Sequence, residues 1–235
     1  MKNLFILTIA LFSIANLSSC KKKGCTDNTA TNYNSKAKKD DGSCLYVPTI
    51  TIIGASDTTI SVGASYSDPG ATAVNKDGSS VDVVTENNVN SSTTGSYEVN
   101  YSATNANGTA TAQRTVKVII GAENWTGPTW SVSSTCSGSQ FPLSNSPTIA
   151  AGGGANEVTI DPFFNVIGGT ASGTINGAAI SIPQQTIVSQ FGDINFSGTG
   201  TMNSSGTQIQ ITYTYDNTIP LIGGQGTCMA IYDKQ

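Results

Sequence analysis

From residue 48 to its end, the chain consists of short alternating segments separated by turn-forming residues, which restricts it to a β-rich fold. Polar and apolar residues alternate in Tyr97–Tyr101 (YEVNY), and Asn107-Gly108 then marks a hairpin turn. The chain has 25 Gly and long runs of Ser, Thr and Asn, which favour strands and turns. Beyond the first twenty residues, we find no stretch of ten or more residues with the 3.6-residue periodicity of an amphipathic helix. The sequence therefore predicts an all-β protein.

The first twenty residues resemble the signal of a bacterial lipoprotein. Lys2 provides a short positive region, and the uncharged stretch Leu4–Ile14 follows it. This stretch fits a signal peptide and is too short to span a bilayer, which takes about 20 apolar residues. Leu17–Cys20 (LSSC) resembles the lipobox. The resemblance implies cleavage before Cys20, attachment of diacylglycerol and acyl chains such as palmitate to that residue, and export from the cytoplasm. The alternative is an ordinary secretory signal with a cysteine near the cut.

Charge divides the mature chain into two parts. Cys20–Val47 has six Lys against three Asp, a net charge of +3, whereas the chain from Pro48 onward has four basic residues against twelve acidic ones, a net charge of −8. Basic residues beside an anionic bilayer are attracted to it, although they equally solubilise a linker. The acidic remainder excludes nucleic acid as a partner.

Four cysteines remain once Cys20 is assigned to lipid. An even number in an oxidising compartment predicts disulfides, and three pairings are possible. Position in the sequence favours Cys25–Cys44, which closes a small module, and Cys136–Cys228, which joins the start of the C-terminal region to its last strand. A thiolate metal site is disfavoured because the chain has no His and no C-x-x-C spacing.

The segment Gly24–Tyr46 resembles a small extracellular module of Bacteroidetes proteins. The matching residues are Gly24–Asp27, Ala30, Asn32–Asn34, Ala37, Asp40–Cys44 and Tyr46. Its oxygen-bearing side chains make Asp27, Asn32, Asp40 and Asp41 candidate calcium ligands, since Ca²⁺ takes six to eight oxygens. The alternative is that these side chains cap turns by accepting hydrogen bonds from their own backbone.

The segment 48–120 resembles a known family of β domains. Alternating or β-branched runs at 48–53, 59–62, 97–101 and 115–119 predict a β-sandwich. The residues resemble the bacterial surface-protein Ig-like domain, which is related to a domain of pesticidal crystal proteins. This resemblance implies an Ig-like sandwich used as a spacer or interaction module, with no catalytic residues. The matching residues are Gly63, Tyr66–Ala73, Asp77-Gly78, Thr94–Tyr97, Val99, Tyr101, Asn107-Gly108 and Arg114–Val116.

The C-terminal region, 121–235, predicts an antiparallel meander that curls into a small barrel or half-barrel. We predict strands at 129–134, 157–160, 170–175, 179–182, 193–199, 208–215 and 227–232. The region also resembles β domains that end other lipoproteins, and this resemblance implies a turn at Ile182–Gln185. Trp125, Trp130, Phe163 and Phe164 are candidate ligand-binding residues that could form a stacking surface or line a barrel. Adjacent strand residues point to opposite faces, so one ring of the Phe pair is expected to be exposed. The alternative is that these aromatic residues are core.

Enzyme chemistry has little support in the sequence. Without His, a Ser-His-Asp or Cys-His arrangement is impossible, and no Gly-rich phosphate-binding sequence precedes a helix. We therefore expect no enzymatic activity and no cofactor. The expected organisation is a signal peptide at 1–19, a lipidated basic stem at 20–47, an Ig-like sandwich at 48–120 and a C-terminal antiparallel β domain at 121–235.

These observations predict a membrane-anchored lipoprotein of the cell envelope, in the outer membrane, with a structural or interaction role. Its partners would be the membrane, through the N-terminal lipid, and a protein or glycan. The alternative is an accessory lipoprotein that binds a glycan or a small apolar ligand in its C-terminal domain. Lys21–Lys23 after the lipidated cysteine differ from the acidic residues of a surface-export signal and favour the periplasmic face. The Ig-like resemblance favours the cell surface, so both faces stay open.

Overall fold

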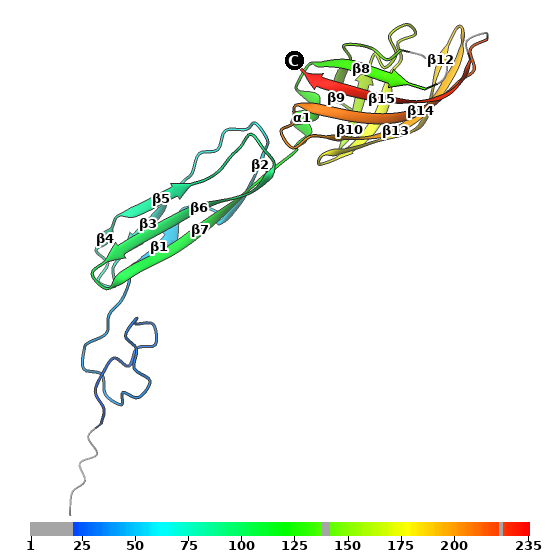
Figure 1. The fold of residues 1–235 in the computed structure, drawn as a ribbon. Helices are drawn as coiled ribbons and strands as arrows, with labels where there is room; N and C mark the ends of the chain where they lie inside the picture. The colour runs from blue at the N-terminus through cyan, green and yellow to red at the C-terminus, as the bar shows by residue number, and fades with distance from the viewer. Residues whose placement is uncertain (1–20, 138–141, 221–222) are drawn as a thin grey trace, which may run out of the picture.

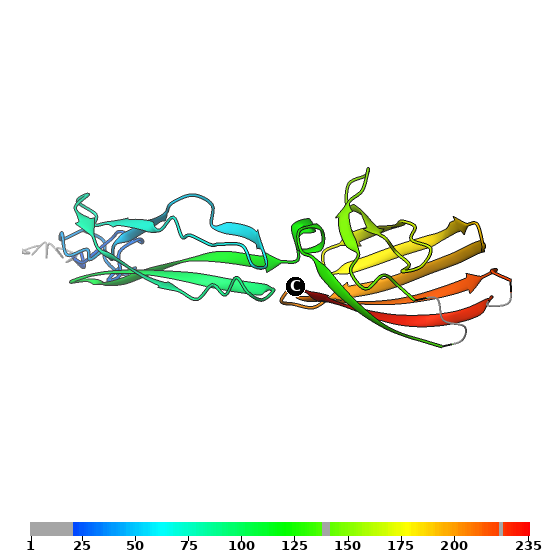
Figure 2. The same ribbon diagram turned by 90° about the horizontal axis from the view of Figure 1, so that it is seen from above.

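The protein is long and narrow, with two groups of strands in succession. The computed structural model describes residues 21–137, 142–220 and 223–235, so the predicted signal peptide and Cys20 lie outside it. The segment before residue 48 lies at one end, and the two groups of strands follow along the long axis (Figures 1 and 2). The single helix of the described ranges, α1 (Ala122–Thr126), lies between them. Within those ranges, no helix is long and apolar enough to cross a membrane. The structure confirms the predicted all-β class.

The first group of strands is a two-sheet sandwich. One sheet has the order β1-β3-β4 and the other the order β2-β7-β6-β5. The parallel pair is β2 with β7, and the long β6–β7 hairpin is joined through the predicted turn before Gly108. The predicted Ig-like sandwich is therefore confirmed. Its strands are β1 (Thr49–Ile52), β2 (Asp57–Ser61), β3 (Ala71–Val74), β4 (Ser80–Val81), β5 (Val83–Asn87), β6 (Gly95–Asn105) and β7 (Gly108–Ile119).

A buried arginine ties the loops of this sandwich to its strands. Arg114 is 1% exposed, and its Nε lies 3.1 Å from Oδ1 of Asp68 and donates to the hydroxyl of Tyr101 at 3.1 Å. The Tyr101 hydroxyl in turn donates to the same carboxylate oxygen at 2.7 Å. The two terminal nitrogens donate to the carbonyls of Ala55 and Ile53. A charge placed among apolar strands is tolerated only when it is paired and hydrogen-bonded in this way.

The second group of strands is a meander that curls into a half-barrel. The eight-stranded sheet has the order β8-β15-β14-β13-β12-β11-β10-β9, and every neighbouring pair is antiparallel. The predicted C-terminal meander is confirmed. The strands are β8 (Trp130–Cys136), β9 (Thr148–Ala151), β10 (Glu157–Asp161), β11 (Ala171–Asn176), β12 (Ala179–Ser189), β13 (Gly192–Met202), β14 (Gln208–Asn217) and β15 (Gly224–Lys234).

The turn predicted at Ile182–Gln185 is wrong. This segment lies inside β12, where the register with β13 shifts between Ile182 and Gln185. The side-chain amide of Gln185 accepts a hydrogen bond from the backbone N–H of Ser172 and donates one to its carbonyl. Between these two pairs β12 has one residue more than β13, which is a β-bulge. The Gln185 side chain then bonds to the backbone of β11 beyond the last β11–β12 pair, Thr174 with Ser181.

Glycines on the inner face of the half-barrel make room for large side chains on the next strand. Gly198 is paired with Tyr213, and Gly200 with Ile211. A Cβ on Gly198 would lie 2.8 Å from Cβ of Tyr213, and one on Gly200 would lie 2.7 Å from Cγ1 of Ile211. Since β-carbons do not approach other atoms so closely, only glycine lets these side chains fold over β13.

The sandwich has its own core around Val99, Tyr101 and Val116, and its end also packs into the core of the half-barrel. Val62 and Ile120 of the sandwich belong to the same buried cluster as Trp125 and the interior of the half-barrel. Asn124 in α1 seals this contact, because its side chain donates to the carbonyl of Val62 at 2.9 Å and accepts from the N–H of Gly121 at 2.9 Å. The junction is therefore packed and hydrogen-bonded.

The stem is attached to the opposite end of the sandwich. Asn105 and Asn107, at the β6–β7 turn, donate through their side chains to the carbonyl of Tyr46 at 2.9 Å and 3.1 Å. The ammonium group of Lys76 lies 4.8 Å from the centre of the Tyr46 ring, within cation–π range. The end of the stem is thus held against the sandwich by contacts from two separate loops.

We predict that Arg114→Met destabilises the sandwich by about 3–5 kcal/mol, because it leaves the Asp68 carboxylate without its buried partner. Urea unfolding of the whole chain, followed by far-ultraviolet circular dichroism, measures the effect. The control is Gln113→Met, at an exposed position of the same strand. Equal midpoints for the two variants would contradict the assigned role of Arg114.

We predict that Cys136→Ala/Cys228→Ala destabilises the half-barrel by up to about 4–5 kcal/mol, because the disulfide closes a long loop in the unfolded chain. Tryptophan fluorescence during urea unfolding reports this change, since Trp125 and Trp130 are both buried in the core of the half-barrel. Cys25→Ala/Cys44→Ala serves as the control and is expected to leave that transition in place. An unchanged unfolding midpoint for Cys136→Ala/Cys228→Ala would refute the stabilising role of this disulfide.

Candidate functional site

The four aromatic residues predicted as a ligand-binding surface are core residues. Trp125 and Phe164 are 0% exposed, Trp130 is 1% and Phe163 is 2% exposed. Each indole finds a backbone acceptor inside the protein: Trp125 donates to the carbonyl of Gly177 at 3.0 Å, and Trp130 donates to that of Trp125 at 3.3 Å. The prediction of an exposed stacking platform is therefore wrong.

The expectation that one ring of the Phe pair is exposed fails for a local reason. Phe163 and Phe164 lie between β10 and β11, outside any named strand, so the alternation of a strand does not apply to them. Phe163 stacks on Phe196 with ring centres 4.6 Å apart, and Phe164 contacts Phe163 edge-on at 4.9 Å. Both rings fill the half-barrel.

The candidate calcium ligands in the stem are engaged by their own module. Asp27 accepts from the N–H of Thr29 and from the hydroxyl of Tyr46, and these hydrogen bonds lower the pKa of Asp27 to about 2. Asn32 accepts from the backbone of Leu45. Asp40 and Asp41 accept from the backbone two residues ahead. The structure supports the turn-capping alternative, and the described residues contain no group of three or more metal-binding side chains of the His, Cys, Asp or Glu types.

The two disulfides have the pairing that the sequence favours. Cys25 and Cys44 are bonded with their Cα atoms 4.8 Å apart, within the stem. Cys136 and Cys228 are bonded with their Cα atoms 4.0 Å apart and are directly opposite each other on β8 and β15. The second bond therefore fixes the edge strand β8 to the end of the meander. Cys20, the predicted lipid site, lies outside the described residues.

The outer face of the half-barrel has a row of hydroxyl side chains that sequence reasoning missed. Thr174, Ser181, Thr199 and Thr212 occupy directly opposite positions on β11, β12, β13 and β14. Directly opposite residues share a face of an antiparallel sheet, so these hydroxyls form a continuous row. Which hydroxyls become neighbours depends on strand register, which the sequence does not give. Alternation along each strand indicates only which residues share a face of that strand.

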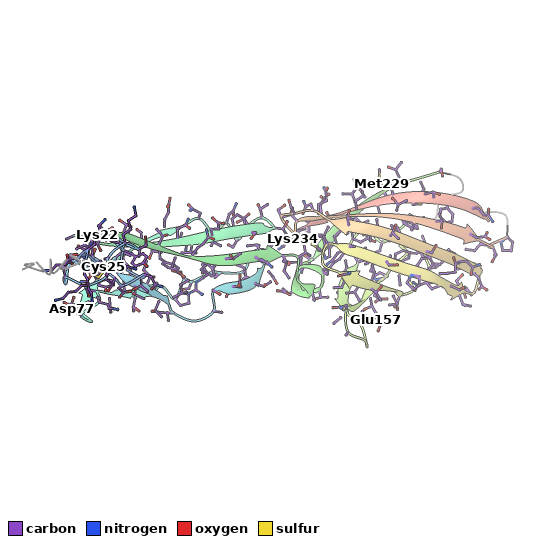
Figure 3. All side chains as sticks on the ribbon, turned by 90° about the horizontal axis from the view of Figure 1, so that it is seen from below. Lys22, Cys25, Asp77, Glu157, Met229 and Lys234 are labelled. Carbon is purple, nitrogen blue, oxygen red and sulfur yellow. A yellow bond between two sulfur atoms is a disulfide. The ribbon has the colours of Figure 1, made fainter. Side chains whose placement is uncertain are left out.

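This row is bounded by two residues of different character. Glu157 on β10 is opposite Thr174, and Met229 on β15 is opposite Thr212. Figure 3 labels both, on opposite sides of the half-barrel sheet, with the row crossing the strands between them. The uninterrupted hydroxyl part of the row therefore extends over four neighbouring strands.

Two shallow hollows lie on this sheet. The larger has a volume of about 690 Å³ and contains the whole hydroxyl row together with Asn176, Thr201 and Gln210, and none of its lining residues is charged. The smaller, of about 430 Å³, lies near the far ends of the same strands. Its polar lining comprises Ser137, Gln184, Asn195, Thr214, Tyr215, Asp216, Gln225 and Thr227. Hydroxyl and amide side chains line both hollows, beside the apolar groups of Ile175, Ala179 and Ile180 in the larger one, and the candidate site is a surface that can form hydrogen bonds.

Comparisons with solved structures give matches of low similarity. Among solved structures, the lipoprotein BT2262 from Bacteroides thetaiotaomicron matches with 18% identity and a TM-score of 0.30, over 79% of this chain and 99% of that one. The CBM51-2 and INT domains of ZmpB from Clostridium perfringens match with 14% identity and a TM-score of 0.25, over 79% of this chain and 44% of that one. The comparison with curated proteins gives no match.

The family comparison is specific to the sandwich. Residues 50–118 match the family described as "Bacterial surface protein, Ig-like domain", and this range contains nearly all of β1–β7. TM-scores below 0.5 do not establish a fold shared over the whole chain, so the assignment is carried by the family match and by the two-sheet architecture. The chain therefore contains, at residues 50–118, an Ig-like domain of the bacterial surface-protein family.

Proposed function

We propose that this protein is a non-enzymatic lipoprotein of the cell envelope that holds its C-terminal half-barrel at a distance from the membrane and presents it to a partner. The lipobox-like Leu17–Cys20 supports the lipid anchor, which we assign to the outer membrane. The family description of residues 50–118 supports an envelope location. In this proposal, the Ig-like sandwich is the spacer and the half-barrel carries the interaction surface.

The observation that carries the proposal is the continuity of the molecule from stem to half-barrel. Domains joined by a small polar interface move relative to each other by default. Here Val62 and Ile120 share a core with the half-barrel, and the N–H of Thr94 donates to the carbonyl of Ser204 at 2.9 Å across the junction. Such a junction suits a spacer, because the position of the half-barrel then follows from that of the anchor.

An accessory ligand-binding role is the second candidate. It is favoured by the two hollows on the outer face of the half-barrel, which together involve five neighbouring strands. The buried aromatic residues exclude the binding mode first expected for it, since they fill the interior.

We predict that Cys20→Ser moves the protein from the membrane fraction to the soluble fraction of the envelope, because acyl chains contribute about 0.8 kcal/mol per buried methylene to membrane binding. Fractionation of cells followed by detergent phase partition measures this distribution, and the chain that keeps Cys20 is expected in the outer-membrane fraction. The control is Cys25→Ser/Cys44→Ser, which removes a disulfide and leaves the anchor. Persistent membrane association of Cys20→Ser would reject the lipid anchor.

We predict that inserting Gly-Ser-Gly-Ser between Ile120 and Gly121 shortens the mean maximum dimension of the chain and broadens its distance distribution. The flexible linker replaces a packed junction by a random coil. Small-angle X-ray scattering of the whole chain provides the measurement. The same insertion after Gly153, in an exposed turn, is the control. Identical scattering from both insertions would show that the junction does not determine the shape.

A further inference from the structure

The outer face of the half-barrel is a grid of polar side chains set by strand register. The hydroxyl row Thr174–Ser181–Thr199–Thr212 has a neighbouring row on each side. One is Asn176–Ala179–Thr201–Gln210, and the other contains Ser197, Thr214 and Thr227. Neighbouring strands are about 4.8 Å apart, and successive rows are about 7 Å apart because outward positions alternate along a strand.

The hydroxyls of the central row are available to a ligand. Thr174, Ser181, Thr199 and Thr212 are all exposed. In the described part of the chain, none of these four side chains is engaged in a hydrogen bond to another protein group. Each hydroxyl offers one donor and two acceptor positions. The row therefore presents both kinds of group at regular intervals.

The hollow over this row follows from one small residue. Ala179 lies between Asn176 and Thr201 in its row, and all three line the hollow of about 690 Å³. A methyl group between two longer polar side chains leaves a depression whose rim donates and accepts hydrogen bonds. Glu157 lies at the β10 end of the hydroxyl row, where its Oε2 accepts from the N–H of Gly154 at 2.7 Å and its other oxygen can accept from a ligand hydroxyl.

The chemistry of this face selects among classes of partner. Nucleic acid and acidic polymers are bound through Lys and Arg, and neither residue lines either hollow. A membrane surface or an apolar peptide requires a contiguous apolar patch, which rows of hydroxyls and amides do not provide. An uncharged polymer with many hydroxyl groups matches the face in charge and in hydrogen-bonding capacity.

We propose that the outer face of β11–β14 binds a neutral polysaccharide that lies across the strands. The spacing of the hydroxyl row is close to the length of one hexopyranose unit in an extended chain, so consecutive sugar units meet consecutive side chains. Binding uses hydrogen bonds from Thr174, Ser181, Thr199 and Thr212. This inference rests on the proposed function, because it names the partner that the half-barrel presents.

Native affinity electrophoresis of the whole mature chain carrying Cys20→Ser tests the proposal. Separate gels contain hydroxyethyl cellulose, laminarin, galactomannan or, as an acidic comparison, polygalacturonate. Retardation is expected in at least one neutral polymer and not in polygalacturonate. Thr199→Val/Thr212→Val removes two hydroxyls at nearly constant volume. It is expected to weaken the apparent affinity about tenfold, as for two lost hydrogen bonds.

The matched control is Thr104→Val/Thr109→Val, a directly opposite exposed pair on β6 and β7 of the sandwich. It is expected to keep full retardation, and thermal unfolding verifies that both double variants are folded. Three results would overturn the proposal. The first is unchanged mobility in all three neutral polymers, and the second is retardation in polygalacturonate alone. The third is that Thr199→Val/Thr212→Val is retarded as strongly as the chain that keeps both threonines. Each leaves the anchored-spacer function intact, because membrane fractionation measures that function independently.

Discussion

The apolar contact between the sandwich and the half-barrel determines the shape of the whole molecule. Val62 and Ile120 insert into the same core as Trp125, and Asn124 satisfies the backbone polar groups that this contact buries. The two β units would otherwise be linked by a short flexible segment. With the contact in place, the stem, the sandwich and the half-barrel follow one another along a single axis (Figure 2).

Strand positions were largely predictable because they depend on local pattern. The alternation in Tyr97–Tyr101 and the turn before Gly108 lie in the β6–β7 hairpin, as predicted. The bulge at Ile182–Gln185 was wrongly predicted as a turn, because that prediction came from a resemblance to other lipoprotein β domains and not from the pairing of the strands. The structure resolves this through Gln185, whose amide bonds reach Ser172 on the neighbouring strand and had no local sequence signal.

The candidate site was not predictable from the sequence, because which residues are neighbours depends on register. A shift of one residue moves every side chain to the other face of a sheet. Thr199 and Thr212 are 13 positions apart in the printed sequence and become neighbours through the pairing of β13 with β14. The prediction that one ring of the Phe pair is exposed assumed the alternation of a strand. Phe163 and Phe164 lie in an irregular segment, where alternation does not apply, and both rings reach the interior.

The parallel pairing of β2 with β7 gives the sandwich a mechanical property. Gly108, at the start of β7, lies beside Val47 of the stem, and Ile119, at its end, lies at the junction with the half-barrel. Tension applied between the stem and the half-barrel therefore pulls β7 one way and β2 the other. The two strands are in register from Asp57 and Thr115 to Ser61 and Ile119, so this tension loads their ladder in shear. All hydrogen bonds of this ladder are then loaded at the same time and together resist sliding of the two strands. The sandwich therefore bears force along its length.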